Sequence, residues 1–328
     1  MFDKVKPKIV ISKCIEFENC RYNGQIISSD VIKELIPYVE FIQVCPEVEI
    51  GLGIPRDPIR IVFKENKKLL FQPSTEKDVT KQMKIFSKTF LDQQKNIDGF
   101  ILKSRSPSCG LKEVKIYPGE KQVPPIGRSA GFFGEEVLKN FSHLAMEDEG
   151  RLKNPTIREH FLRKIYTYAR FRLIRKSQSL SDLINFHTKH KFLFMAYNQQ
   201  RLKILGQIVA NNDKDSINNI IKKYEINLHL SFKKSPRCTS NINVLMHSFG
   251  YFKDKISKKE KTYFLETLKQ YRNGQLSLAS VISIINMWIV RFEEQYLKQQ
   301  QFFSPYPKKL IHAENIDSCF SKDYWRGK

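Results

Sequence analysis

The first 150 residues alternate between short, continuous apolar runs and segments in which apolar residues recur at helical spacing. The apolar runs predict strands at residues 8–13, 39–44, 59–63 and 99–102. The helical spacing predicts helices at residues 30–38, 76–95 and 135–146. Strands and helices that alternate in this way predict an α/β domain with a Rossmann-like, mostly parallel sheet.

From residue 151 onward the apolar pattern is helical throughout. Residues 151–176 read as a basic amphipathic helix, and further helical patterns follow at 180–210, 214–226, 241–254, 258–272 and 276–300. Residues 302–328 extend beyond the last of these patterns. We therefore predict an α/β domain at 1–150, a basic connecting helix at 151–180 and an all-α domain at 181–328.

Composition places the chain among soluble globular proteins. It has 328 residues, of which 41% are hydrophobic and 27% are charged. No charge-free apolar run is long enough to cross a bilayer, and the N-terminus MFDKVKPKIV is too short and too charged for a signal peptide. We therefore expect a cytoplasmic protein with no membrane partner.

The net charge of +22 is concentrated in the second half of the chain. Residues 1–150 carry 23 Lys and Arg against 21 Asp and Glu, a net of +2, whereas residues 151–328 carry 33 against 13, a net of +20. A lysine-rich genome would spread the charge evenly. A one-sided positive field attracts polyanions, so the second half is expected to bind RNA or DNA.

Three of the six cysteines follow predicted strands. Cys14, Cys45 and Cys109 each lie at or beyond the carboxyl end of an apolar run. In an open parallel sheet these ends line one edge, which is where ligands bind. In the cytoplasm cysteines are more often reduced, reactive or metal-binding than disulfide-bonded. The three thiols are therefore expected to meet in space.

The stretch from Lys103 to Gly110 contains one thiol, two cations, three hydroxyls and a glycine. Its Ser, Pro and Gly content predicts a loop at a strand end. Lys103 and Arg105 would favour the thiolate form of Cys109, which binds metal and attacks electrophiles. The alternative is a half-buried cysteine in a basic turn.

Three thiolates from separate loops suit two kinds of metal centre. Structural zinc usually has a fourth protein ligand and paired C-x-x-C cysteines, and no such pair is present. An iron-sulfur cluster held by three cysteines leaves one iron open, and that iron can act as a Lewis acid toward sulfur. Cys20, six residues after Cys14, could provide a fourth ligand or be a spectator.

Several polar residues beside the cysteines are candidates for chemistry. Glu47, two residues after Cys45, is either a general base or a solvent-facing carboxylate. Ser106 and Ser108 either donate hydrogen bonds to sulfur or cap the turn. The segment GRSAGFFG, residues 127–134, either brings the backbone close to a ligand or forms a plain turn, and Arg128 is its candidate binding residue.

The first half of the chain resembles the thiouracil desulfurase family. The resemblance covers about residues 6–150 and rests on Cys14 with Arg21-Tyr22-Asn23-Gly24, on Cys45-Pro46-Glu47 with Gly51, Gly53 and Pro55-Arg56, and on the whole stretch Lys103–Gly110. It implies a 4Fe-4S cluster held by Cys14, Cys45 and Cys109, with one iron that no cysteine binds. It also implies that Glu47 and Ser106 assist in removing sulfur from a thiocarbonyl.

This sequence departs from the family pattern in the first motif. Ile15-Glu16-Phe17 replaces a Leu-Leu-Gly run, Asn23 replaces the more usual Asp, and Cys20 is an additional cysteine. Cys14 is still expected to bind the cluster. The shape of the pocket and the role of Cys20 do not follow from the family pattern.

The second half resembles the YbgA-like helical domain. The motifs that carry this resemblance are Phe186–Ala196, Asn243–Phe252 and Tyr271–Gly274. The fusion resembles tRNA 4-thiouridine desulfidases, which implies tRNA as a partner. The candidate contacts to RNA or substrate are Arg21, Lys103, Arg105, Arg128, Lys189, Lys191 and Arg201, together with Lys203.

The histidines in the helical half could be metal ligands or ordinary core and surface residues. His187 and His190 lie three residues apart on a lysine-rich helix, and no carboxylate accompanies them or His247. We therefore expect histidines of the core or of an RNA surface, not metal ligands.

The sequence thus predicts a desulfidase that converts a thiolated uracil base, 4-thiouridine in tRNA, to uridine and hydrosulfide. Two alternatives stay open at this point. One is a desulfurase of free 2-thiouracil whose helical domain only oligomerises. The other is a non-catalytic iron-sulfur protein that binds RNA as a sensor.

Overall fold

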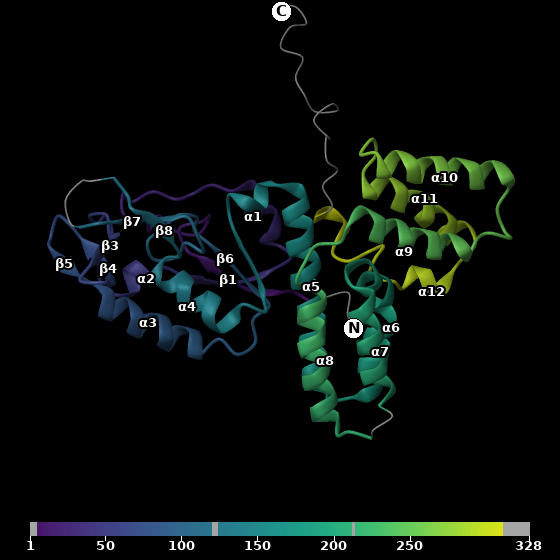
Figure 1. The fold of residues 1–328 in the computed structure, drawn as a ribbon, viewed down its shortest axis with the longest axis horizontal. Coiled ribbons are helices and arrows are strands. Elements are labelled where there is room, and N and C mark those ends of the chain that lie inside the picture. The colour runs from purple at the N-terminus through teal and green to yellow at the C-terminus, as the bar shows by residue number, and fades with distance from the viewer. Residues whose placement is uncertain (1–4, 120–123, 212–213, 311–328) are drawn as a thin grey trace, which may run out of the picture. The chain divides into compact units, whose positions relative to one another are not determined.

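The computed structural model describes residues 5–119, 124–211 and 214–310. The chain forms two compact units, residues 1–172 and residues 173–328, and the boundary falls inside helix α5 (Pro155–Ser177). Figure 1 shows strands and helices in the first unit and helices alone in the second. The predicted domain limits at 150 and 180 stay a prediction. Residues 311–328 of the predicted C-terminal extension, including Cys319, lie outside the described residues.

A four-stranded parallel sheet forms the centre of the first unit. Its strand order is β2 (Glu40–Val44), β1 (Lys8–Ser12), β6 (Gly99–Leu102) and β9 (Ala145–Asp148). All three strand pairs are parallel. Strand β6 is buried along its whole length and β1 along nearly all of it, which explains their continuous apolar runs. The predicted α/β fold with a parallel sheet is confirmed.

A second sheet has the order β5 (Lys77–Asp78), β4 (Lys67–Gln72), β3 (Arg60–Lys64), β7 (Val114–Tyr117) and β8 (Gly127–Ser129). It is mixed, because β3 pairs with β7 in parallel and the other pairs are antiparallel. Glu65 and Asn66 both have positive φ and form the tight turn between β3 and β4. The sequence analysis predicted β3 but not the other four strands, whose short or lysine-rich stretches lack a clear apolar pattern.

The helices of the first unit are α1 (Asp30–Leu35), α2 (Pro46–Glu49), α3 (Thr80–Asp92), α4 (Phe132–Phe141), the 3₁₀ helix η2 (Arg151–Lys153) and the first part of α5. Helices α3 and α4 pack against each other. The predicted helix at 135–146 was wrong at both ends. Helix α4 begins earlier, at Phe132, and residues 145–148 form β9, a strand of the central sheet.

In the described part of the second unit, the end of α5 is followed by helices only. These are α6 (Leu180–Tyr197), α7 (Gln199–Ala210), α8 (Ile217–Ser231), α9 (Cys238–Gly250), α10 (Lys258–Arg272), α11 (Leu278–Arg291), α12 (Gln295–Lys298) and the 3₁₀ helix η3 (Lys308–Leu310). The predicted all-α class of this half is confirmed. The pattern at 180–210 forms two helices, because Asn198 is extended and its side chain caps α7 through the Arg201 N–H.

The core of the second unit is aromatic. Phe186, Tyr224 and Trp288 are among its largest fully buried side chains. In the part of the chain that the structure describes, no helix combines the length and the apolar character that a membrane span requires.

Candidate metal centre

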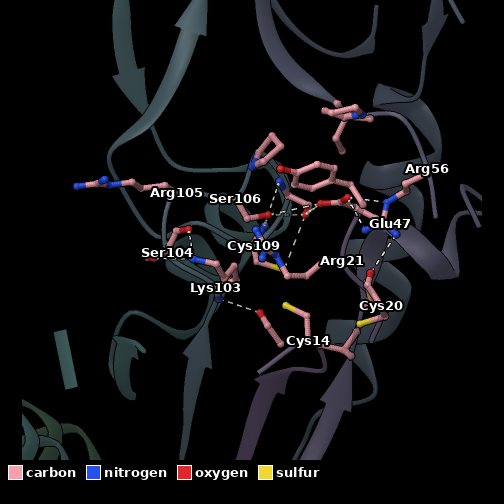
Figure 2. A pocket seen from close by; sticks show the side chains of 18 residues that line it. Cys14, Cys20, Arg21, Glu47, Arg56, Lys103, Ser104, Arg105, Ser106 and Cys109 are labelled. Atoms are coloured by element: carbon pink, nitrogen blue, oxygen red, sulfur yellow. Dashed lines mark hydrogen bonds and ion pairs between the residues drawn. The ribbon is translucent and has the colours of Figure 1, made fainter. Parts of the chain in front are cut away.

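Three of the predicted cysteines lie together at one edge of the parallel sheet. Cys45 follows β2 directly, Cys14 lies two residues beyond β1, and Cys109 lies in the loop that leaves β6. Because β1 stands between β2 and β6, these three carboxyl ends are neighbours, at the point where the strand order reverses. All three cysteines are buried and line one pocket of about 260 Å³ (Figure 2).

Cys20 is a fourth sulfur in this pocket. Its residue is fully buried and lines the cavity with the other three cysteines. Interaction with the Cys14 thiol, followed by burial, raises the pKa of Cys20 to about 11. The Cys45 thiol also donates to the Cys20 carbonyl oxygen over 3.8 Å. The four thiols are free, so the pocket presents four sulfur atoms that are not joined by disulfides.

Burial favours the protonated form of these thiols. It raises the pKa of Cys109 to about 12, although Ser12 and Ser108 form hydrogen bonds that favour the thiolate. The hydrogen bond with Cys20, followed by burial, raises the pKa of Cys45. The expectation that Lys103 and Arg105 favour the Cys109 thiolate was therefore wrong. A bound metal would supply the positive charge that removes these protons.

Neither Lys103 nor Arg105 points its charge at Cys109, although the sequence had suggested this. The Lys103 ammonium forms a 2.6 Å ion pair with Glu149, whose carboxylate also accepts the Ser104 N–H over 2.8 Å. Glu149 is only 7% exposed, and these groups hold its pKa below the ordinary value despite burial. The charge of Lys103 is thus compensated inside the fold. Arg105 is exposed, and Figure 2 shows its side chain extending away from the cysteines.

Glu47 is held rigidly at the pocket wall. Its Oε2 atom forms an ion pair with Arg56, with 2.7 Å to Nη2 and 2.9 Å to Nε. Its Oε1 atom accepts a 2.6 Å hydrogen bond from the Ser108 hydroxyl (Figure 2). The Glu47 side chain is 12% exposed, so it does not extend into solvent. The alternative of a solvent-facing carboxylate does not fit this geometry.

Ser106 caps the turn, whereas the Ser108 hydroxyl lies within hydrogen-bonding distance of Glu47 and, at 3.8 Å, of the Cys109 sulfur. Ser106 Oγ accepts the Cys109 N–H over 3.1 Å and lies 3.5 Å from Glu47, so its stronger contact caps the turn. Ser108 makes the short contact to Glu47 and is 1% exposed. The sequence analysis missed Ser108 as the partner of Glu47, and it missed Arg56 altogether. Ser108 and Arg56 both belong to motifs on which the family resemblance rests, and this membership could have identified them as site residues.

The first turn of α4 holds the Cys109 loop in place through backbone hydrogen bonds. The N–H of Gly131 donates to Gly110, that of Phe133 donates to Ser108 over 2.9 Å, and that of Gly134 donates to Ser108 over 3.0 Å. A Cβ at Gly134 would lie 2.3 Å from the Gly110 carbonyl oxygen. The glycine-rich segment therefore brings backbone close to the cysteine loop, which neither interpretation from the sequence included.

Replacing Gly134 with Ala is expected to displace the Cys109 loop. Overpacking of this kind costs about 1–3 kcal/mol, and the contact atom is backbone, which cannot rotate away. Metal uptake should fall although no ligand is changed. Gly127→Ala is the matched control, because a Cβ there has nothing within 4 Å. Equal metal content per chain in the two variants would contradict this role for Gly134.

Of the two remaining predicted binding residues in the first unit, Arg21 lies at the pocket and Arg128 does not. Arg21 lines the pocket beside Tyr22, with its guanidinium 5.6 Å from the centre of the tyrosine ring. Arg128 is not among the residues that line the pocket. Its side chain is 62% exposed and forms an ion pair with Glu113 on a separate part of the surface.

In the second unit the predicted RNA contacts lie on α6 and α7. Lys191 is exposed, as is Lys203, and Lys189 is half-buried. Arg201 is half-buried and donates to Asn227 over 2.8 Å, which ties α7 to α8. Of the four predicted contacts, Lys191 and Lys203 are thus the two whose side chains are exposed to a partner.

The histidines of α6 belong to the core. His187 contacts the Tyr224 hydroxyl over 3.0 Å, and burial lowers its pKa to about 4. His190 is buried and bonds to the Phe186 carbonyl over 2.7 Å. Among the described residues, no group of three His, Cys, Asp or Glu side chains is arranged to hold a single metal ion.

The donor set of the pocket suits a sulfur-ligated cluster. Thiolates are the preferred ligands of iron-sulfur clusters, in which each cysteine binds a separate iron, so the sulfurs need not converge on one point. Cys14, Cys45 and Cys109 come from three different loops and open into one cavity. The residues present therefore fit such a group.

In a comparison with known proteins, each half of the chain matches a different protein family. The family described as 2-thiouracil desulfurase matches residues 9–149, and a family described as a protein of unknown function, DUF1722, matches residues 191–307. The solved structure of a 4Fe-4S-dependent thiouracil desulfidase, TudS, is similar, with 27% identity and a TM-score of 0.36 over 45% of this chain and 94% of that chain.

Two curated bacterial proteins are also similar. The uncharacterized protein YbgA of Escherichia coli is 26% identical over 131 residues, which are 39% of this chain and 76% of that protein. The uncharacterized protein YbbK of Bacillus subtilis is 32% identical over 109 residues, which are 31% of this chain and 72% of that protein. The chain is therefore a desulfurase that belongs to the 2-thiouracil desulfurase family through residues 9–149 and carries a DUF1722, or YbgA-like, domain after it.

Proposed function

We propose that the protein is an iron-sulfur-dependent desulfidase that converts 4-thiouridine in tRNA to uridine and hydrosulfide. The observation that carries the proposal is the pocket in which Cys14, Cys45 and Cys109 lie beside the immobilised carboxylate of Glu47. Sulfur ligands and a carboxylate in one cavity suit the exchange of a thiocarbonyl sulfur for the oxygen of water.

The proposed cofactor is a 4Fe-4S cluster bound by Cys14, Cys45 and Cys109, with one iron that no cysteine binds. When bound, it would supply a Lewis acid with high affinity for sulfur. The three cysteines come from the ends of three neighbouring strands, so the sheet fixes their positions before any metal is present.

Glu47 is proposed to orient a water molecule and take its proton. The reaction adds water to the thiocarbonyl carbon, breaks the carbon-sulfur bond and releases hydrosulfide, with no change in oxidation state. Arg56 and Ser108 hold the two oxygens of Glu47 in fixed directions. The carboxylate therefore loses little conformational entropy when it acts as a base. Ser108 and Arg56 are then positioning residues.

The base would have to leave its stack to reach this pocket. The cysteines are buried, at 9%, 9% and 5% exposure for Cys14, Cys45 and Cys109, so a base inside a helical stem could not contact them. Tyr22 lines the pocket and is 43% exposed, which makes it available for stacking on an extruded base.

The helical half supports an RNA substrate through its charge. The net charge of +20 over residues 151–328 favours a polyanion, and Lys191 and Lys203 are exposed on consecutive helices. The resemblance of the fused arrangement to tRNA 4-thiouridine desulfidases is the reason to prefer 4-thiouridine over other thiolated bases.

The test is turnover of two substrates by the anaerobically reconstituted full chain. Nucleoside analysis of treated tRNA should show loss of 4-thiouridine with an equal gain of uridine, and kcat/KM for tRNA should exceed that for free thiouracil. Raising the salt concentration should lower kcat/KM for tRNA steeply but leave the free base almost unaffected. Activity confined to the free base would refute the tRNA proposal and support the free 2-thiouracil alternative.

The matched variants separate binding from chemistry. Lys191→Gln with Lys203→Gln should raise KM for tRNA and leave turnover of free thiouracil unchanged. Lys67→Gln, an exposed lysine of the first unit, is the control. An equal effect of both changes on tRNA turnover would mean that α6 and α7 do not form the RNA surface.

A further inference from the structure

Glu149 is a buried carboxylate near the metal centre to which the proposed chemistry gives no role. It follows β9 directly, is 7% exposed and is not among the residues that line the pocket. Burial of a charged carboxylate costs free energy unless hydrogen bonds and an opposite charge compensate it. The groups that compensate Glu149 therefore indicate what its charge does in the fold.

Glu149 holds the first two residues of the Cys109 loop. Its Oε1 atom accepts hydrogen bonds from the Lys103 ammonium over 2.6 Å and from the Ser104 hydroxyl over 2.7 Å. Its Oε2 atom accepts the Ser104 N–H over 2.8 Å. Lys103 also donates to the Ser104 carbonyl oxygen over 2.9 Å. One carboxylate thus fixes the backbone and both side chains at the start of the loop, which Figure 2 shows at the pocket wall.

The start of the loop is held from the opposite side by β1. Strand β6 lies between β1 and β9 and ends at Leu102. The next N–H, that of Lys103, donates over 2.9 Å to the hydroxyl of Ser12 at the end of β1. The Ser104 N–H donates to Glu149, which follows β9. Side chains from both neighbouring strands therefore take over the hydrogen bonds of β6 where strand pairing stops, so the loop leaves the sheet in a fixed direction.

The turn between Ser104 and Cys109 is short and internally hydrogen-bonded. The Cys109 N–H donates to the Ser106 hydroxyl over 3.1 Å, and the Gly110 N–H donates to the Ser106 carbonyl oxygen over 2.9 Å. Arg105 alone separates Ser104 from Ser106, and its φ of 57° lies in the left-handed region. A residue with a side chain keeps that conformation only where its neighbours hold it. A displacement of Ser104 would therefore reach Cys109.

We propose that Glu149 is a positioning residue of the metal centre, which fixes the direction of the Cys109 sulfur by holding the start of its loop. The inference rests on the proposed function, in which Cys109 binds the cluster. Glu149 acts through Ser104 and the turn that follows, and not by binding metal. Without it all three cysteines are still present, but Cys109 samples a wider range of positions and holds the cluster less firmly.

The first measurement is hydrogen exchange in the metal-free full chain. Glu149→Gln keeps the size of the side chain but replaces charge-assisted hydrogen bonds with neutral ones. Exchange over residues 103–110 should become about tenfold faster, which corresponds to the loss of one hydrogen bond to a charged group. Exchange over β3 should stay at the wild-type rate. Glu147→Gln is the matched control, because Glu147 lies on the same strand but forms its ion pair with Arg151.

The second measurement uses the anaerobically reconstituted protein. The rate at which an iron chelator removes iron should rise in Glu149→Gln by about the same factor and stay at the wild-type value in Glu147→Gln. Lys103→Met combined with Glu149→Leu replaces the ion pair with apolar side chains, which leaves no unpaired charge and should keep the thermal stability near wild type. Exchange over the loop and release of iron should still be fast in this double variant, because the Ser104 N–H has lost its acceptor.

Two outcomes would overturn this role for Glu149. One is wild-type exchange over residues 103–110, together with wild-type release of iron, in Glu149→Gln and in the double variant. The other is an equal acceleration of exchange in β3 and in the loop, which would mean that Glu149 only stabilises the unit as a whole. A wild-type protein that takes up no iron or sulfide would instead refute the cluster proposal, and the exchange measurement, made without metal, would still decide whether Glu149 holds the loop.

Discussion

Replacing Glu47 with Gln is expected to lower turnover of the thiolated substrate by about 10²–10⁴-fold. The amide has nearly the shape of the carboxylate, but it cannot accept a proton from water. Binding of iron and sulfide should be unchanged, because Glu47 lies beside the proposed ligands and is not one of them. The loss should appear in kcat, since the proton transfer belongs to the chemical step.

The control for this change is Glu49→Gln on the same short helix. Glu49 is exposed, whereas Glu47 is tied to Arg56 and Ser108. Steady-state kinetics with either tRNA or free thiouracil measure the two variants side by side. Turnover by Glu47→Gln close to that of wild type, with full cluster content, would mean that Glu47 serves only to hold Arg56.

The positions of the cysteines could be predicted because they depend on a simple property of parallel sheets. Cys14, Cys45 and Cys109 follow strands that read as apolar runs, and adjacent parallel strands end at the same edge. That step predicts a shared edge without any side-chain contact. The proximity of the three thiols also requires that β1 lie between β2 and β6, which the structure shows.

The partners of the charged residues could not be predicted in this way. Lys103 is neutralised by Glu149, which lies 46 positions further along the chain, and Glu47 is neutralised by Arg56, across a loop. Sequence proximity placed Lys103 beside Cys109 and suggested a lowered thiol pKa, but the ion pair and burial reverse that direction. Charge pairing in a fold depends on which strands are neighbours, and a single sequence does not contain that information.

The two ends of helix α4 could not be predicted from the sequence either, because tertiary contacts determine them. Apolar spacing places a helix near residues 135–146, but its start is set by loop carbonyls of residues 107–110 that accept the N–H groups at its first turn. Its end is set by β9, which pairs with β6. Both limits come from tertiary contacts. The glycine-rich segment thereby supports the loop that carries Cys109.

Replacing Cys45 with Ala is expected to reduce iron and acid-labile sulfide to background and to abolish desulfurase activity. The change removes one of the three proposed protein ligands, and the alanine methyl group offers no ligand atom in its place. Cys45 is the N-cap residue of α2 but makes no side-chain capping hydrogen bond, so the helix itself should not suffer.

The measurement is iron and sulfide per chain after anaerobic reconstitution, with circular dichroism to show that the fold is kept. Cys238→Ala, in the second unit, is the control and should bind the full cluster. Because Cys20 lines the same pocket as Cys45, partial iron in Cys45→Ala would indicate that Cys20 replaces the lost ligand. The double variant with Cys20→Ala should then lose that remaining iron. Full iron and sulfide in Cys45→Ala and in the double variant would refute the proposal that Cys45 is a ligand of the cluster.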